Sequence, residues 1–386
     1  MKSKKVDFLY SILSSVLPLI VIQLLLIPLY SHHVTKHEFG IFLLVITIIN
    51  MTTVILGNTL NNIRLTDKDE INEYEYLMYL FLLSLVQIII SLIVCIFFKL
   101  SLSVGLNIIF WSVALMFKTY FLVYFRVVIN YKDYLISSII NAVTLFLGVL
   151  MLYVIKIDIF LIYAIAEILT LLFVVTKVRH YFKNYRLVII SKQKRRNFQS
   201  LLSANIISNL ILYSDRILIG SILGAAFVPY FFIATTIGKM SNLIINPIAN
   251  VLLSYNVKEN NKINIKNELK NFIKLILITL VFSIVIYFCS LIFIKYFYSQ
   301  YYEATKQILW ISNFAVLLLS ITSIPQMKLI GNNKYRSNLN INVIILVLLA
   351  VTSPMIYFFG LLGYSYCLIL ISLIKYLLIL KTLSKH

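Results

Sequence analysis

Long apolar runs recur along the whole chain, separated by short segments that hold most of the charged residues. Each run is about twenty residues long, which is the length an α-helix needs to cross the hydrocarbon core of a bilayer. A backbone inside lipid must satisfy its own hydrogen bonds, so such runs form helices. The pattern therefore predicts an all-α polytopic membrane protein with about twelve transmembrane helices, at residues 8–30, 40–60, 77–98, 104–125, 134–155, 158–178, 199–222, 229–253, 273–294, 306–329, 339–359 and 363–381.

The composition agrees with this pattern. Of the 386 residues, 61% are hydrophobic and 12% are charged, and the mean hydropathy is +0.95, whereas soluble domains are about half apolar and about a quarter charged. The first run follows Lys2, Lys4 and Lys5, as in a signal peptide, but it is too long for one and lacks a small-residue cleavage site. We therefore keep it as the first span and predict no soluble domain.

Lysine and arginine are distributed unevenly between alternate loops. If the N-terminus lies inside, the inside segments hold most of the 34 basic residues, and the outside loops hold only Lys36, Lys99, Lys156, Lys295 and Lys306. Because basic residues accumulate in cytoplasmic loops, we predict that the N- and C-termini are both cytoplasmic. The formal net charge of +20 then reflects topology, and we do not expect nucleic acid as a partner.

The longest basic loop, at 179–199, lies halfway along the chain and separates six spans from six. It is either a linker whose basic face meets anionic membrane lipids, or a topology anchor alone. A faint repeat, FGIFLLVITII at 39–49 and FVPYFFIATTI at 227–237, opens the second span of each half. Because both halves start on the same side, we expect a parallel pseudo-two-fold repeat. The predicted domains are an N-terminal six-helix bundle at 1–185, a basic cytoplasmic linker at 186–198 and a C-terminal six-helix bundle at 199–386.

Ionisable side chains inside the predicted spans are the main candidates for function. Facing lipid, each would cost about 2.5–3.5 kcal/mol, and six would cost roughly 15–21 kcal/mol, which is above the stability of a typical domain. Most must therefore face a neighbouring helix or a water-filled cavity, although the last one is close enough to a helix end to snorkel. These residues are Lys118, Glu167, Asp215, Arg216, Lys239 and Lys375.

Uncharged polar residues repeat at helical spacing on three spans and form stripes along one face of each. The stripes either are hydrogen-bonding contacts between helices or line a shared polar cavity, and for runs of four we favour the cavity. The net positive charge inside the spans suits an anionic substrate. The predicted cavity residues are Asn50 and Arg64 on the second span, Lys118 on the fourth, Asn205, Asn209 and Arg216 on the seventh, and Lys239, Asn242 and Asn246 on the eighth.

Two carboxylates inside the spans are candidates for coupling or for ion pairing. Glu167 is either an ion- or proton-coupling group or the buried partner of a lysine such as Lys118, and we slightly favour the ion pair. Asp215 and Arg216 are adjacent and point about 100° apart on a helix, so they pair poorly with each other. Asp215 is instead expected to lie near Lys239 across the hairpin of the seventh and eighth spans, and it is the other candidate for coupling.

Several segments, in order along the chain, resemble one family of membrane proteins. YSDRILIGSILGAAFVPYFFIATTI (213–237) resembles the Asp-Arg to Gly to Tyr to Ala block of Wzx-type polysaccharide-repeat flippases, in the multidrug/oligosaccharidyl-lipid/polysaccharide exporter superfamily. The order and spacing carry the resemblance, and one departure is Val228-Pro229, where a glycine usually precedes the tyrosine. The other matching segments are IPLYSHHVTKHEFGIF (27–42), YSQYYEATKQIL (298–309), GNNKYRSNLN (331–340) and FFGLLGYSYC (358–367).

The resemblance implies a flippase of the bacterial cytoplasmic (inner) membrane. Such a protein moves undecaprenyl-pyrophosphate-linked oligosaccharide repeat units from the inner to the outer leaflet by alternating access, for O-antigen lipopolysaccharide, capsule or a related surface polysaccharide. Arg216, Lys239, Lys118 and Arg64 would attract the anionic head group, and the asparagines would bind sugar hydroxyls. The implied partners are the lipid-linked oligosaccharide, a polysaccharide polymerase, a chain-length regulator, and H⁺ or Na⁺ as coupling ion. No cofactor is implied.

Two other classes of protein are alternatives to the flippase. A multidrug exporter of the same superfamily would share the fold, but cationic drugs call for an acidic cavity. A membrane-embedded polysaccharide polymerase, ligase or glycosyltransferase would need a large outside loop with catalytic groups, and the short outside loops offer only the acids Glu38, Asp158 and Glu303. We therefore do not expect an enzyme.

Histidine and cysteine give little support for metal or redox chemistry. His32, His33 and His37 form an H-H-x-x-x-H pattern in the first outside loop, for which an exposed polar loop is a simpler account than a metal site. The three cysteines lie at scattered positions inside predicted spans and show neither a disulfide framework nor a metal-binding spacing.

Overall fold

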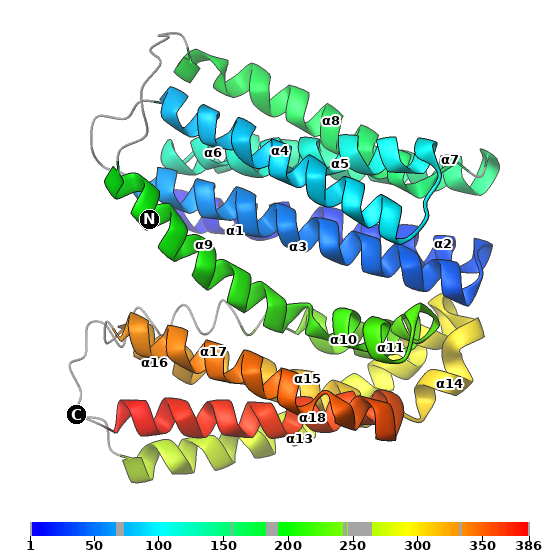
Figure 1. The fold of residues 1–386 in the computed structure, drawn as a ribbon, viewed down its shortest axis with the longest axis vertical. Coiled ribbons are helices and arrows are strands. Elements are labelled where there is room, and N and C mark those ends of the chain that lie inside the picture. The colour runs from blue at the N-terminus through cyan, green and yellow to red at the C-terminus, as the bar shows by residue number, and fades with distance from the viewer. Residues whose placement is uncertain are drawn as a thin grey trace. The chain divides into compact units, whose positions relative to one another are not determined.

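The computed structural model describes residues 2–66, 73–155, 157–182, 192–241, 245, 265–331 and 334–384, and within these ranges every regular element is a helix (Figure 1). Nine helical segments are long and apolar enough to cross a membrane, and three shorter apolar helices, Leu201–Leu212, Ala225–Met240 and Arg336–Thr352, bring the described candidates to the expected twelve. The predicted all-helical membrane fold is confirmed.

The chain divides into two compact units, which are described separately. Unit 1 comprises Met1–Val34 and Val45–Asn209, and unit 2 comprises Thr35–Leu44 and Leu210–His386. Residues 183–191, which include half of the predicted linker, lie outside the described part of the chain. The predicted domain boundaries therefore stay a prediction.

Unit 1 is built from α-helices that pack lengthwise against one another. Helix α5 packs on α8 and on α4, and α7 packs on α1 and α8. Its core is rich in aromatic side chains, among them the fully buried Trp111, Tyr120 and Tyr124. The elements are α1 (Lys2–Ile20), the π-helix η1 (Val21–Leu26), α2 (Ile27–His33), α3 (Lys36–Thr66), α4 (Glu73–Phe97), α5 (Leu102–Phe121), α6 (Val123–Val127), α7 (Tyr131–Ile155), α8 (Ile159–Val178), the 3₁₀ turn η2 (Arg179–Phe182) and α9 (Lys192–Leu212).

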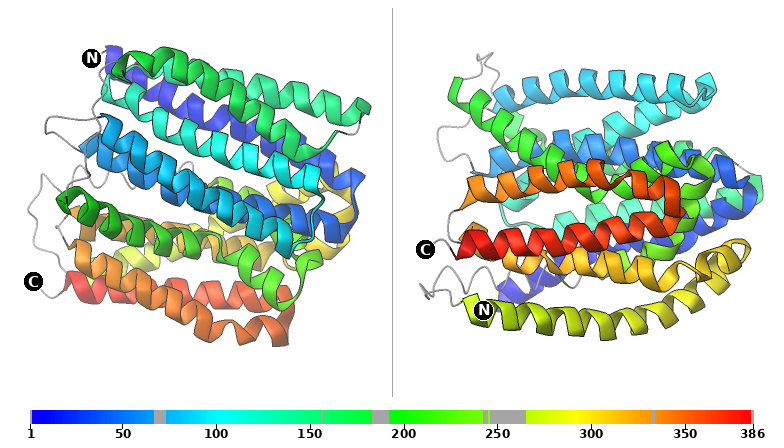
Figure 2. Two further views of the ribbon diagram at one scale, coloured as in Figure 1. Left: turned by 45° about the horizontal axis from the view of Figure 1, so that its top comes forward. Right: turned by 60° about the horizontal axis from the view of Figure 1, so that its bottom comes forward.

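Unit 2 repeats this kind of packing around α15, which contacts α11, α13 and α18. Helices α17 and α18 also lie side by side (Figure 2). The described elements are α10 (Ser214–Ile222), the 3₁₀ turn η3 (Ala225–Phe227), α11 (Val228–Met240), α13 (Ile265–Phe297), the 3₁₀ turn η4 (Ser299–Tyr301), α14 (Tyr302–Lys306), α15 (Leu309–Ile321), α16 (Ser323–Gly331), α17 (Tyr335–Thr352) and α18 (Pro354–Leu383).

Side-chain caps fix where several helices begin. Thr35 and Glu38 form a capping box at α3, in which the Thr35 N–H donates to Glu38 Oε2 at 2.8 Å and the Glu38 N–H donates to Thr35 Oγ1 at 3.3 Å. Ser101 accepts from the N–H of Val104 at the start of α5, and Asp158 accepts from the N–H of Phe160 at the start of α8. Each cap satisfies a backbone donor that the first helical turn leaves unpaired.

The first turns of α3 pack with unit 2, although the rest of the helix belongs to unit 1. The buried Phe39 ring lies 6.0 Å from the Tyr301 ring, and the Lys36 ammonium lies 5.5 Å from the centre of the Tyr230 ring. Gly40 meets the carbonyl of Ala225 so closely that a Cβ at residue 40 would overlap its oxygen. A glycine is therefore required at this approach.

Breaks inside the spans are the main departures from the expected helices. The predicted seventh span, 199–222, is two helices that separate at Tyr213. The predicted turn at 360–362 is confirmed, because the helical backbone is broken at Gly360. Gly360 has a φ of 59°, a conformation that L side chains rarely adopt. A further interruption lies inside the predicted span 339–359, because α17 ends at Thr352 and α18 begins at Pro354.

Candidate functional site

An ion pair between Asp215 and Lys239 lies in unit 2, where two helices end. Lys239 Nζ donates to Asp215 Oδ2 at 2.5 Å, and Asp215 is only 3% exposed. Asp215 lies in the first turn of α10 and Lys239 in the last turn of α11. An anion at a helix N-terminus and a cation at a C-terminus are each stabilised by the helix dipole. The expectation that Asp215 lies near Lys239 is confirmed.

The start of α10 is held against α18 by a buried hydroxyl pair. Ser214 Oγ and Tyr364 Oη are 2.7 Å apart, and the Tyr364 ring meets the Phe231 ring of α11 edge-on at 5.0 Å. Both Ser214 and Tyr364 are buried. The hydrogen bond holds the residue that immediately precedes Asp215, at the start of α10.

Arg216 lies over an aromatic ring of the same unit. Its guanidinium carbon is 4.7 Å from the centre of the Phe232 ring of α11, a distance typical of cation–π contacts. The prediction that Arg216 continues the face of Asn205 and Asn209 is wrong, because the helix is interrupted at Tyr213 and the 3.6-residue period does not carry across the break.

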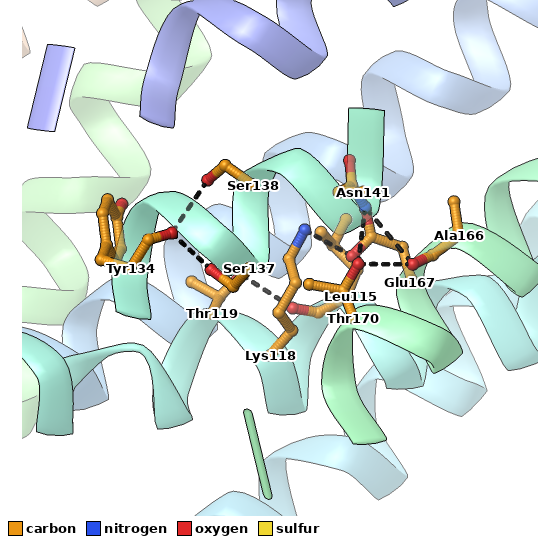
Figure 3. Close-up of polar contacts among 10 residues, drawn as sticks. All are labelled: Leu115, Lys118, Thr119, Tyr134, Ser137, Ser138, Asn141, Ala166, Glu167 and Thr170. Carbon is orange, nitrogen blue, oxygen red and sulfur yellow. Dashed lines mark hydrogen bonds and ion pairs between the residues drawn. The ribbon is translucent and has the colours of Figure 1, made fainter. Parts of the chain in front are cut away.

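A second buried ion pair lies within unit 1, between α5 and α8. Lys118 Nζ is 2.5 Å from Glu167 Oε2, and their side chains are 15% and 9% exposed. Figure 3 shows Asn141 of α7 beside the pair; its amide donates to Glu167 Oε1 at 3.2 Å and to Thr170 Oγ1 at 3.2 Å. The pairing of Glu167 with Lys118 is therefore confirmed. Asn141, which completes the cluster, was not singled out from the sequence because an isolated asparagine forms no stripe.

A polar cluster with two arginines lies at the C-terminal end of α3. Asn61 donates to the carbonyl of Thr119 at 2.9 Å and accepts from Arg126 Nη1 at 3.1 Å. Arg64 is buried, and its guanidinium carbon is 5.5 Å from the centre of the Tyr124 ring. Arg126 was expected in a loop, after the span that ends at residue 125, and its link to Asn61 emerges only from the fold.

The remaining predicted cavity residues have mixed outcomes. Asn205 donates to Thr59 Oγ1 on α3 at 2.8 Å, and Asn209 donates to the carbonyl of Asn205 at 2.8 Å. The Asn205 bond is a contact between helices, as the alternative interpretation of the stripes expects. Asn50 is half-buried in α3. Asn242 and Asn246 lie outside the described residues, as does Asn250.

Lys375 is buried within unit 2 at 8% exposure. The expectation that it snorkels to a helix end is therefore wrong, because its side chain packs inside the bundle. Within the part of the chain that the structure describes, no three His, Cys, Asp or Glu side chains gather as a metal site.

The comparisons with known proteins identify the fold. No protein-family model matches the chain, and no curated protein matches it. The structure is similar to the inward-facing conformation of a multidrug resistance MATE family transporter of the MOP superfamily, with a TM-score of 0.64 and 13% identity over 98% of this chain and 96% of that one. An outward-facing conformation of such a transporter gives a TM-score of 0.57 and 14% identity over 99% and 94% of the two chains.

A third similar structure is the Vibrio cholerae MATE transporter VcmN in the bent form, with a TM-score of 0.55 and 13% identity over 99% of this chain and 97% of that one. At these identities the likeness establishes the fold, and the chain has the MATE fold of two six-helix bundles. The fold fits the two described units, each with buried polar groups in an otherwise apolar helical bundle.

Proposed function

We propose that this chain is a secondary transporter that moves its cargo across the membrane by alternating access. The observation that carries the proposal is the fold, which covers nearly the whole of transporters described in both inward- and outward-facing conformations. Buried ion pairs within spans support it, because ionisable groups at membrane depth mark transport pathways and ion relays. We place the protein in the cytoplasmic membrane of a bacterium with both termini inside, on the distribution of lysine and arginine.

Our first candidate for the cargo is an amphipathic drug-like molecule, exported as by a multidrug exporter. Its support is that the similar structures named above include multidrug resistance transporters of the MOP superfamily. The two ion pairs also favour a drug-like cargo over an anionic one. Each pair neutralises a lysine that would otherwise contribute positive charge, Lys118 in unit 1 and Lys239 in unit 2.

A second candidate is a lipid-linked oligosaccharide, which the sequence resemblance favours. Lys375 adds a buried positive charge to the described part of unit 2, beyond the neutral pair of Asp215 and Lys239. A surplus of positive charge attracts a pyrophosphate and disfavours a cationic drug. In this case a polysaccharide polymerase, a chain-length regulator and anionic lipids would be partners.

We propose H⁺ or Na⁺ as the coupling ion, and Asp215 and Glu167 as the carboxylates that respond to it. Each is held by a lysine at 2.5 Å, so binding of a cation at the carboxylate competes with the lysine. Release of the lysine would change the contacts between two helices: α10 and α11 for Asp215, and α5 and α8 for Glu167. This gives a local ion a means of altering the packing of a bundle.

The two cargo classes are separated by one pair of assays on the same variants. Expression in a bacterial host deprived of its own drug exporters should lower the accumulation of fluorescent cationic dyes if the cargo is a drug. Deletion in the native host should remove surface polysaccharide if the cargo is an oligosaccharide. In either case, Asp215→Asn should abolish the activity while the protein still inserts; full activity of that variant would contradict the coupling role. Failure of both assays would refute the transporter proposal.

A further inference from the structure

The helix that carries Lys239 ends one residue after it. Helix α11 ends at Met240, and the Ser241 N–H closes a tight turn on the carbonyl of Gly238 at 3.2 Å. Thr235 and Thr236 each donate to the carbonyl four residues earlier, a pattern that bends helices. The position of the lysine thus depends on how this last turn is held.

A side chain of the neighbouring helix α15 forms hydrogen bonds with this turn. Asn313 is fully buried; its amide nitrogen donates to the carbonyl of Ala234 at 2.8 Å, and its amide oxygen accepts from the N–H of Gly238 at 3.1 Å. In a regular helix, the Gly238 N–H donates to the carbonyl of Ala234, four residues earlier. The amide of Asn313 therefore contacts both of the backbone groups that a regular helix pairs with each other.

Two further contacts fix the position of the Asn313 amide. The amide nitrogen of Asn313 also donates to the carbonyl of Leu309 in its own helix at 2.9 Å, which fixes the side-chain rotamer. A Cβ on residue 238 would overlap the amide oxygen of Asn313, so only glycine leaves room for it.

We propose that Asn313 is a positioning residue, which holds the end of α11 where Lys239 meets Asp215. Gly238, which accepts the amide, immediately precedes Lys239. The fully buried amide of Asn313 has its two donors and its acceptor used at once, so it has little freedom to move. Its importance for transport rests on the proposed function, whereas its effect on the ion pair does not.

A thermodynamic cycle on the purified full-length chain in detergent tests the positioning role. Asn313→Ala is made in the native chain and in a background without the ion pair, Asp215→Asn/Lys239→Met. We expect a smaller loss of Tm in the background, because there is no ion pair left to position. The control Ser312→Ala removes an equally buried group that bonds Ser365 of α18 instead, and its two losses of Tm should be equal. Equal losses for Asn313→Ala would overturn the proposal.

A second variant keeps the proposal testable if Asn313→Ala does not fold. Gly238→Ala keeps Asn313 but adds a methyl group that overlaps its amide oxygen. The loss of Tm should again be smaller in the background without the ion pair. Gly105→Ala is its control, because a Cβ there makes an ordinary 3.4 Å contact with Cys95 Sγ. Equal losses of Tm for Gly238→Ala in the two backgrounds would likewise overturn the proposal.

Transport measurements separate this inference from the proposed function. In transport, we expect Asn313→Ala to reduce the rate by about three-fold or more in the native chain, as for directly coupled residues. A coupled Tm with an unchanged transport rate would leave the positioning role standing and contradict the role of the ion pair in transport. A reduced rate with an uncoupled Tm would contradict the positioning role.

Discussion

Removing Lys118 should destabilise the protein through the carboxylate that it leaves behind. In Lys118→Met, Glu167 loses its ammonium partner and keeps the hydrogen bond from Asn141, in a site where the carboxylate is 9% exposed. Breaking a buried ion pair by removing one partner typically costs about 3–5 kcal/mol. Replacing both partners by uncharged side chains of similar size is often nearly neutral.

The size of the loss has an upper bound, because the stranded carboxyl can take up a proton. At pH 7 that uptake costs a carboxyl of ordinary acidity about 3.7 kcal/mol. The loss in Lys118→Met should therefore be about 2–4 kcal/mol at pH 7. Once the folded variant holds the proton and its unfolded chain does not, stability should fall by about 1.4 kcal/mol per pH unit as the pH rises. The destabilisation should accordingly shrink between pH 7 and pH 5.

Thermal unfolding of the purified chain in detergent, followed between pH 5 and pH 7, measures this prediction. Lys118→Met/Glu167→Gln should recover most of the lost stability and show little of the extra pH dependence. The matched control is Lys177→Met in the same unit, because the Lys177–Asp133 pair is longer, at 3.5 Å, and the lysine is 46% exposed. Exposed pairs contribute about 0–1 kcal/mol. An equal loss in the single and double variants, or no change with pH, would refute the reasoning.

Three further outcomes are expected. Arg216→Ala should greatly reduce transport while the protein still inserts. Arg216→Lys should restore little transport, because an ammonium does not stack over Phe232 as a planar guanidinium does. Unchanged transport in cells would count against a role for this residue. Gly40→Val should lower the yield of folded protein, measured by gel filtration in detergent, because its side chain would overlap Ala225, and a normal yield would contradict the close approach. Reporter fusions within 183–191 should give a cytoplasmic signal, and an outside signal would overturn the predicted topology.

The sequence predicted the pairs of charged residues better than the faces on which they lie. Lys118 with Glu167 and Asp215 with Lys239 follow from the cost of a lone charge in lipid, which leaves few possible partners. The stripe from Asn205 to Arg216 was wrong because the period of 3.6 residues assumes an unbroken helix. Nothing local at Tyr213 shows the break as a proline would.

Hydrogen bonds between distant helices were the part of the site that could not be predicted. The bonds of Asn141 to Glu167 and of Ser214 to Tyr364 join residues 26 and 150 positions apart. An asparagine or tyrosine inside an apolar run has many possible partners, and the choice depends on which helices pack and how far each is shifted along its axis. Asn313 is the clearest case, since its partners are backbone groups that have no signal in the sequence.

The sequence by itself determined that the chain is a bundle of about twelve membrane-spanning helices, because the length and hydrophobicity of a span are local properties set by the bilayer. It also determined that charges within the spans must find partners, because lipid offers them none. Only the tertiary structure decided that the predicted seventh span breaks at Tyr213 and how Asn313 holds the end of α11. Those features arise from contacts between segments far apart in the chain, and their energy depends on distances that no sequence period specifies.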